Sequence, residues 1–436
     1  MSESTERFIA AFDARRSAAK ASVPIWLEEL RKAGMARFAE SGFPTPRNEE
    51  WKYTNVEPAV SLPYGQPNGE AKNLSAPDIF SKGFVEAGAP RMIFLNGVYA
   101  PELSSVGSPS GVRMASLAEL SARDDPALAP RIGRYADFRR DAFVALNTAF
   151  MSDGAVIVIS PGCRLAQPIY LVYASGVGRR PIVSHPRTLI LLGADSEVKI
   201  IESYAGVSSG QYLCNSVTEV VGEASSVAHH CRLQRESDSA FHVGTLAARL
   251  ERGSHLTATA VTLSGALVRN NVHVSLCGEG AECVLDGLYI GADKQHIDNF
   301  TEIEHVQPRA RSLELYKGIL DGAAHGVFNG KIIVHKDAQK SDARQTNRNL
   351  LLSADAVVNT QPQLEIYADD VKCSHGSTIG QLDPDALFYL RSRGLGSREA
   401  RSLLSFAFAS DIVRRIHVDF LRRQLDDYMV GRFQKI

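Results

Sequence analysis

The sequence predicts a mainly β protein whose core is a parallel β-solenoid, with helical regions at both ends. Residues 154–371 consist of short apolar runs separated by turns, with no convincing helical period. Within this region one turn pattern recurs at similar intervals. After Asp383 the apolar period changes to that of a helix. The expected strands include the runs AVIVIS, TLILLG, EVKIIE, VHVSLC, KIIVHK and QLEIYA.

The recurring turn has the form Gly-x-x-small-x-apolar. Its small residue falls 27 to 42 residues apart, at Cys163, Ser196, Ser225, Ser254, Ala281, Ala323 and Ala356. A solenoid stacks the same turn on each coil, and a small side chain suits an inside corner where two strand directions meet. A β-sandwich has no reason to repeat one turn at such spacing. A sandwich or a two-sheet α+β domain remains the alternative.

Helical patterns flank this core. Apolar residues between Ser4 and Glu40 indicate two amphipathic helices broken near Pro24, and residues 139–150 indicate one more short helix. At the other end Asp383 is placed to cap a helix that Gly394 ends, and a further helical pattern begins at Ser397. We therefore expect an N-terminal helical and mixed domain (1–150), a parallel β-helix core (151–380) and a C-terminal helical domain (381–436).

The composition excludes several classes of function. The 436 residues carry 48 Lys and Arg against 49 Asp and Glu, so no overall field favours nucleic acid or an anionic membrane. The six cysteines form no C-x-x-C pair, which argues against a disulfide framework and a zinc ribbon. The N-terminal stretch has no apolar signal region and no run reaches transmembrane length. We expect a cytoplasmic protein without nucleic-acid or membrane partners.

The segment KCSHGSTIG, residues 372–380, carries two soft metal ligands. On a strand, positions i and i+2 point to the same side, so Cys373 and His375 can present a thiolate and an imidazole to one point. Both are usual ligands of iron and of iron–sulfur clusters. Such a site normally needs about four ligands, so these two make an incomplete one. The alternative is a buried cysteine beside a hydrogen-bonded histidine.

Two other groups of residues could carry chemistry. His229 and Cys231 share one side of a strand with His230 opposite, and His255 and His273 could continue a ladder of donors on later coils. Asp293, Asp298 and residues 302–304 could supply the carboxylates of a carbohydrate-active β-helix. No phosphate-binding loop, nucleophile elbow or dinucleotide fingerprint occurs.

The block NRNLLLSADAVVNTQPQLEIYADDVKCSHGSTIGQLDPDALFYLRSRGL, residues 347–395, closely resembles the signature of the SufB/SufD family of iron–sulfur cluster assembly proteins. NEEWKYTNV (48–56) and DAFVALNTAF (141–150) resemble that family too, so the similarity spans essentially the whole chain. SufB-like members carry HEAT where this sequence has residues 375–378. The intact CSHG and the following FYLRSRG are similar to the SufD branch of the family.

The resemblance implies a right-handed parallel β-helix that pairs with SufB and holds one SufC ATPase subunit on its C-terminal helices. It implies a non-catalytic scaffold, supplied with sulfur by a cysteine desulfurase and its sulfur carrier. By motif match His375, and less firmly Cys373, would be metal ligands for a transient iron or iron–sulfur cluster at the SufB–SufD interface, with nothing held tightly by this subunit alone. The alternative is a purely structural subunit that binds no metal.

The predicted partner contacts follow from these expectations. A self-complementary solenoid edge predicts a homodimer when SufB is absent. An apolar helical stripe that is too apolar for a free surface is expected to receive the ATPase. Its residues are Leu404, Phe408, Ile412 and Ile416.

Overall fold

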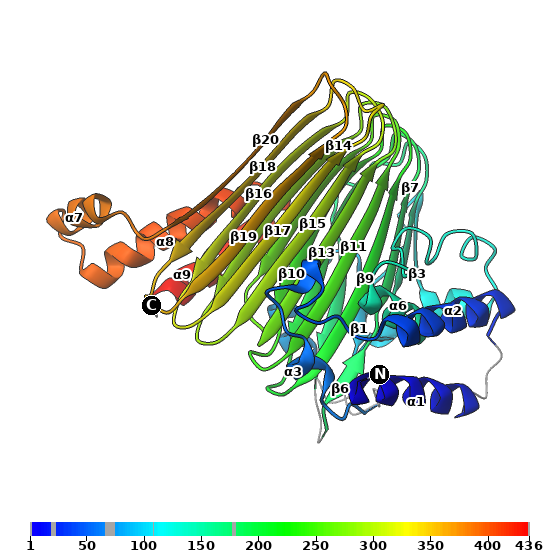
Figure 1. Cartoon of the computed structure of the whole chain (residues 1–436). Helices are drawn as coiled ribbons and strands as arrows, with labels where there is room; N and C mark the ends of the chain where they lie inside the picture. The colour runs from blue at the N-terminus through cyan, green and yellow to red at the C-terminus, as the bar shows by residue number, and fades with distance from the viewer. Residues whose placement is uncertain (1, 19–22, 66–74, 108, 177–179, 435–436) are drawn as a thin grey trace.

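The computed structural model describes residues 2–18, 23–65, 75–107, 109–176 and 180–434. Within these ranges the strands form two 10-stranded sheets that face each other (Figure 1). Sheet 1 has the order β2 (Val98–Tyr99), β1 (Arg91–Leu95), β5 (Ile169–Ser175), β8 (Glu197–Gly206), β10 (Val227–Arg235), β12 (His255–Thr262), β14 (Glu282–Gly291), β16 (Arg311–Leu320), β18 (Asp342–Leu351) and β20 (Lys372–Gly380). Sheet 2 has the order β19 (Val357–Ile366), β17 (His325–Val334), β15 (His296–His305), β13 (Leu267–Leu276), β11 (Phe241–Leu250), β9 (Tyr212–Gly222), β7 (Arg187–Leu192), β4 (Ala155–Ile159) and β3 (Val112–Ser116), and β6 (Ile182–Ser184) pairs with β9.

The chain alternates between the two sheets, so the predicted parallel β-solenoid is confirmed. From β7 onward each strand pairs in parallel with the strand two places later in the sequence. All six apolar runs that we expected to be strands lie in sheet 1 or sheet 2. The strands β1, β2 and β3 precede residue 151, so the N-terminal part of the chain extends both sheets.

Small buried residues mark the corner at which the chain enters sheet 1. They directly precede its strands at intervals of 27 to 31 residues: Ser196, Ser226, Ser254, Ala281, Ala310 and Ser341. The predicted corner residue is therefore correct at Ser196, Ser254 and Ala281 in sheet 1, and at Ala356, which is buried directly before β19 of sheet 2. Ser225 is one residue early and has a positive φ of 57°. Ala323 precedes buried Ala324 at the entry to sheet 2, which explains the irregular interval of 42 residues.

Most of the N-terminal helices cover the outer face of sheet 2, but two short ones, at residues 76–82 and 101–103, contact β8 and β1 of sheet 1. The longer ones are α1 (Glu3–Ala18), α2 (Ile25–Ser41) and α6 (Ala142–Phe150), and the shorter ones are η1 (Glu49–Trp51), α3 (Glu57–Val60), α4 (Ala76–Lys82), η3 (Pro101–Leu103) and α5 (Leu117–Ala122). The break before α2 at Pro24 agrees with the prediction. Helix α6 is buried between α2 and the sheet. A Cβ on Gly34 of α2 would stand 2.9 Å from the carbonyl oxygen of Ala145, so these helices need a glycine where they cross.

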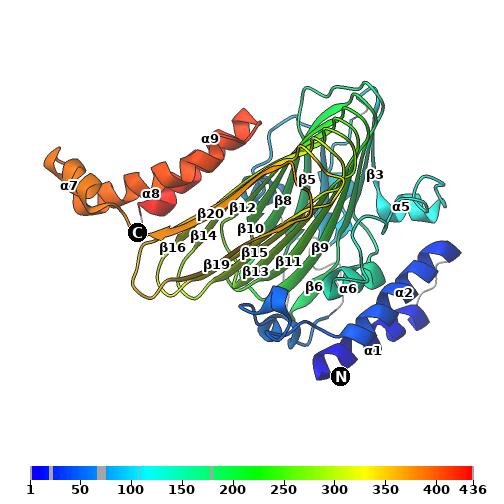
Figure 2. The same cartoon turned by 45° about the horizontal axis from the view of Figure 1, so that its top comes forward.

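The C-terminal helices are α7 (Pro384–Ser392), α8 (Ser397–Val413) and α9 (Asp419–Phe433). Asp383 caps α7 by accepting a hydrogen bond from the backbone N–H of Asp385, as its position predicts. Helices α8 and α9 pack on the outer face of sheet 1, whereas α7 extends beyond the solenoid (Figures 1 and 2). Among the described residues no helix is long and apolar enough to cross a membrane.

Candidate functional site at the open end of the solenoid

The last coil of the solenoid is uncovered. Within the described ranges strand β20 pairs only with β18, and β19 only with β17, so each sheet ends here in a strand with one free edge. Strand β19 includes Pro362, which lacks an N–H to donate and is typical of an edge strand. Large apolar side chains are exposed at this end: Val357, Ile366, Tyr367 and Ile379. Apolar side chains beside two free strand edges are typical of a surface that receives another chain.

The two predicted ligands lie together on this last coil. Cys373 is in register with Ala343, and His375 with Gln345, both of which are buried in the interior. Partners in register on parallel strands face the same way, so Cys373 and His375 share the inner face of the coil. His375 is exposed because no further strand covers it, and Cys373 is half-buried against the apolar core. The structure thus brings the two donors to the open end.

The site is incomplete within the part of the chain that the structure describes. Among the described residues, neither Cys373 nor His375 belongs to a group of three or more His, Cys, Asp or Glu ligand atoms within reach of one metal ion. Burial raises the pKa of Cys373, and the nearby Asp342 raises it further, whereas the backbone of Ala343 acts in the opposite direction. A cation at this point would be needed to stabilise the thiolate, since the surroundings favour the thiol.

The predicted histidine ladder does not form. His229 stacks on His417, which follows α8, with ring centroids 3.9 Å apart. His255 lies 6.4 Å from His229, but His273 belongs to β13 of the other sheet and faces Glu302. Cys231 is buried beneath α8 and α9. The sequence could not assign strands to sheets, and this assignment separates His273 from His229 and His255, which lie on adjacent strands of sheet 1.

The apolar stripe on α8 is largely explained by the chain's own packing. Ile412 and Ile416 are buried against sheet 1, where they contact the apolar cluster that includes Leu288 and Ile319. Phe408 is half-buried, and the ammonium group of Lys317 lies 3.9 Å from the centroid of its ring. The prediction that the whole stripe is a free surface for the ATPase is therefore wrong for Ile412 and Ile416, because the chain's own sheet covers them. Leu404 is half-buried.

Exposed aromatic side chains that sequence reasoning missed lie on α7. Phe388 is 73% exposed and Tyr389 is 57% exposed, and Leu403 of α8 is also exposed. No described residue of α7 is buried. The short apolar pattern DALFYL indicates these two neighbouring aromatic residues. That they are exposed does not follow from the pattern, because it depends on how α8 packs.

Two of the carboxylates that could have served carbohydrate chemistry are engaged elsewhere. Asp298 is buried and forms an ion pair with Arg269. Glu302 is buried, and its Oε1 lies 3.0 Å from Arg140. Neither of these two side chains is free to act on a sugar from an open face, whereas Asp293 is exposed and Glu304 is half-buried.

Comparison with known proteins identifies the family of this chain. The SufBD core domain model of SUF-system FeS cluster assembly matches residues 174–408, and the SufBD N-terminal region model matches residues 2–171. An iron–sulfur cluster assembly SufBD family protein of Synechocystis sp. is 36% identical over 392 residues, covering 88% of this chain and 86% of the relative. The iron–sulfur cluster assembly protein SufD of Escherichia coli is 29% identical over 393 residues, 90% of this chain and 89% of the relative. The chloroplastic protein ABCI7 of Arabidopsis thaliana is 29% identical over 427 residues, 96% of this chain and 88% of the relative. The chain belongs to the SufBD family of iron–sulfur cluster assembly proteins.

Proposed function

We propose that this chain is a SufD-type, non-catalytic scaffold subunit, which pairs the open end of its solenoid with SufB and contributes His375 and Cys373 to a shared site. That site receives iron or a nascent cluster. The observation that carries the proposal is the position of both donors on the inner face of the last, uncovered coil. Two ligands on this side and the remainder from a partner would complete a cluster site.

The free strand edges support the pairing with SufB. Strands β19 and β20 can each add a strand from a partner, because their outer backbone groups have no neighbour within the described chain. The exposed apolar residues Val357 and Ile379 lie on these same two strands. In the absence of SufB, two copies of this chain would use the same surface in a two-fold dimer.

The C-terminal helices support the binding of a SufC ATPase subunit. Phe388 and Tyr389 form an exposed aromatic pair on α7, which projects from the body of the protein (Figure 2). Exposed aromatic residues of this kind are enriched where proteins bind one another. We place the contact on α7 and on exposed Leu403, while Leu404 and Phe408 flank it and Ile412 and Ile416 support it from the core.

The test of the shared site compares two substitutions on one strand. His375→Ala and Ser377→Ala are introduced into this subunit, and each variant is co-expressed with SufB and SufC and reconstituted anaerobically with iron and sulfide. We expect His375→Ala to lower the cluster content of the purified complex, measured from iron, sulfide and visible absorption, while Ser377→Ala leaves it unchanged. Full cluster content in a correctly assembled His375→Ala complex would contradict the ligand role.

A purely structural subunit is the second candidate, and it rests on the exposure of His375. In this candidate, the exposed imidazole of His375 contacts a partner surface and binds no metal. In that case His375→Ala would reduce the amount of SufB that co-purifies, while the clusters per assembled complex would stay constant.

A further inference from the structure

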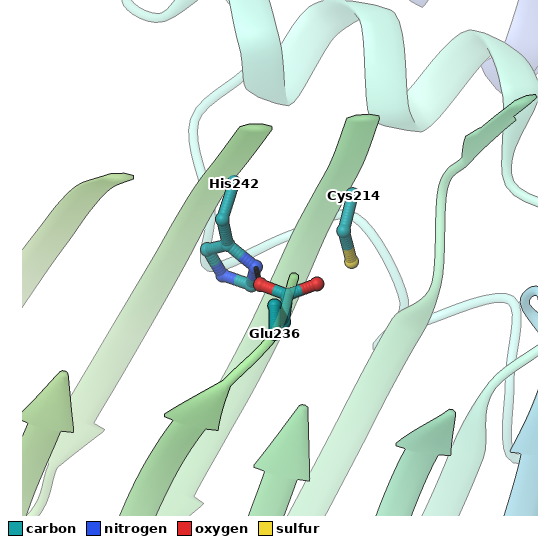
Figure 3. A group of neighbouring side chains, drawn as sticks. All are labelled: Cys214, Glu236 and His242. Atoms are coloured by element: carbon teal, nitrogen blue, oxygen red, sulfur yellow. Dashed lines mark ion pairs between the residues drawn. The ribbon is translucent and has the colours of Figure 1, made fainter. Parts of the chain in front are cut away.

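Three buried side chains with metal-binding atoms meet inside the solenoid, away from the open end. They are Cys214 on β9, Glu236 after β10 and His242 on β11, and one ligand atom from each lies within 4.8 Å of the others (Figure 3). Cys214 and His242 are in register on adjacent strands, so their side chains point inward next to each other. Glu236 reaches them from the corner between the sheets, with its Oε2 2.8 Å from His242 Nδ1.

The polar atoms at this place lack the partners that a buried site needs. The side chains of Cys214 and His242 are at most 1% exposed. Glu236 Oε1 and His242 Nε2 have no hydrogen-bond partner, and His242 Nδ1 has only the ion-pair contact with Glu236 Oε2. A buried polar atom without a partner costs about 1–3 kcal/mol. Several such atoms converging on one point indicate a missing ligand.

The backbone leaves room for this cluster. A Cβ on Gly244 would stand 2.6 Å from His242 Nε2 and 2.9 Å from Arg232 Nη1. The absence of a side chain at residue 244 therefore makes room for the Nε2 edge of the imidazole. The amide of Gln234 lies beside them, with Nε2 2.8 Å from Glu236 Oε2.

We propose that Cys214, Glu236 and His242 bind one divalent transition-metal ion, of the Zn²⁺ or Fe²⁺ class, within the solenoid of this subunit. One sulfur, one nitrogen and one oxygen donor suit such ions and do not suit Mg²⁺ or Ca²⁺, which take oxygen ligands. The amide oxygen of Gln234 or a water molecule can complete a four-coordinate site. This metal is separate from the cluster at the open end, and the inference does not depend on the proposed function.

The charges at the cluster balance when the metal is bound. A thiolate, a carboxylate and a neutral imidazole around a divalent cation sum to zero, which is the condition for low cost in a buried site. Binding releases the thiol proton of Cys214. The nearby positive charge of Arg232 is offset by Glu202, the pKa of which is lowered by the hydrogen bond from His230 and by Arg232. The negative charge of Glu202 therefore compensates for the repulsion between Arg232 and the metal ion.

The experiment uses Co²⁺ as the probe, supplied in minimal medium during expression so that the ion is present while the chain folds. The full-length protein is purified and dialysed against a chelator, and its cobalt content and absorption spectrum are measured. We expect one retained cobalt ion per chain, with thiolate-to-cobalt charge transfer in the near ultraviolet. Cys214→Ser should abolish the charge-transfer band. The matched control is Cys283→Ser, another buried cysteine on β14 that is outside the cluster.

Two further variants make the result decisive. Cys373→Ser should retain the band, because that cysteine lies at the open end. Glu236→Gln keeps the shape of the side chain and should lose cobalt to the chelator faster than the native protein, even if Cys214→Ser does not fold. Absence of the charge-transfer band in the native protein, or its persistence in Cys214→Ser, would overturn the proposal. Loss of all cobalt from the native protein during dialysis would also overturn it.

Discussion

His375 of β20 lies in register with Gln345 of β18, and the side-chain amide of Gln345 donates a 2.7 Å hydrogen bond to Glu314 Oε2 on β16. These three residues form a column that runs from the buried interior to the open end. Glu314 and Gln345 are almost fully buried, while His375 is exposed. The proposed ligand therefore lies one strand beyond a buried hydrogen bond that belongs to this chain.

Glu314 makes the stability of the protein depend on pH. Burial raises the pKa of this carboxyl from its ordinary value of 4.5 to about 7. Because the folded state holds a proton that the unfolded state has lost, stability falls as pH rises between these two values. Glu314→Gln should therefore raise the melting temperature at pH 8 and have little effect at pH 4.5. The gain at pH 8 is on the order of 3 kcal/mol, since one pKa unit corresponds to about 1.4 kcal/mol.

Thermal unfolding at the two pH values tests this, with exposed Glu279→Gln as the control. An equal shift in melting temperature at both pH values would show that folding does not change the pKa of Glu314, which contradicts the prediction.

A charge at the free edge should block pairing. Ile379 on β20 is 50% exposed, and Ile379→Asp places a carboxylate where a partner strand would bury it. We expect loss of SufB from the co-purified complex and loss of the homodimer, as measured by light scattering after size-exclusion chromatography. Val98→Asp is the matched control, because Val98 is 53% exposed on β2 at the opposite edge of sheet 1. If both variants pair normally, the open end is not the interface.

Removing the aromatic pair on α7 should release the ATPase. The double change Phe388→Ser and Tyr389→Ser deletes exposed side chains and leaves the described core intact. We expect at least a tenfold loss of SufC affinity, since hot-spot aromatic residues contribute about 2 kcal/mol or more. The control is Val430→Ser on α9, which is 43% exposed. Unchanged binding would place the contact elsewhere.

The motif NEEWKYTNV (48–56) has a structural role, because its Trp51 packs against Arg269 of the solenoid. Substitution of Arg269 tests this role. The guanidinium carbon of Arg269 lies 4.3 Å from the centroid of the Trp51 ring, and Arg269 pairs with buried Asp298. Arg269→Met leaves the Asp298 charge without its partner, which should cost about 3–5 kcal/mol. Thermal unfolding and limited proteolysis of the N-terminal region measure this loss. The exposed Arg344→Met is the control, and equal stability of the two variants would contradict the role of Arg269.

Much of this fold could be predicted from the sequence, because strands, helix caps and helix breaks depend on residues that are close together in the chain. Strand runs, the Asp383 cap and the break at Pro24 follow from backbone geometry within a few positions. The position of Cys373 and His375 on one face follows from the two-residue period of a strand. Their location on the last coil was implied by family resemblance and could not be obtained from spacing alone.

The wrong predictions concern residues whose position depends on which distant segments pack together. His273 was placed on the wrong sheet, and Ile412 and Ile416 were treated as surface because the sequence does not reveal that sheet 1 lies beneath them. The interior cluster was missed because Cys214 and His242 are far apart in sequence. Their separation of 28 residues equals one coil of the solenoid, and this interval could have identified them.

If His375 is a ligand, iron must reach the open end of the solenoid, and iron-edge anomalous diffraction from the iron-loaded complex with SufB and SufC tests this most directly. We predict an anomalous peak within bonding distance of His375, between β20 and the partner chain. An iron peak far from His375, or a SufB subunit seated on another face with β20 left open to solvent, would contradict the account.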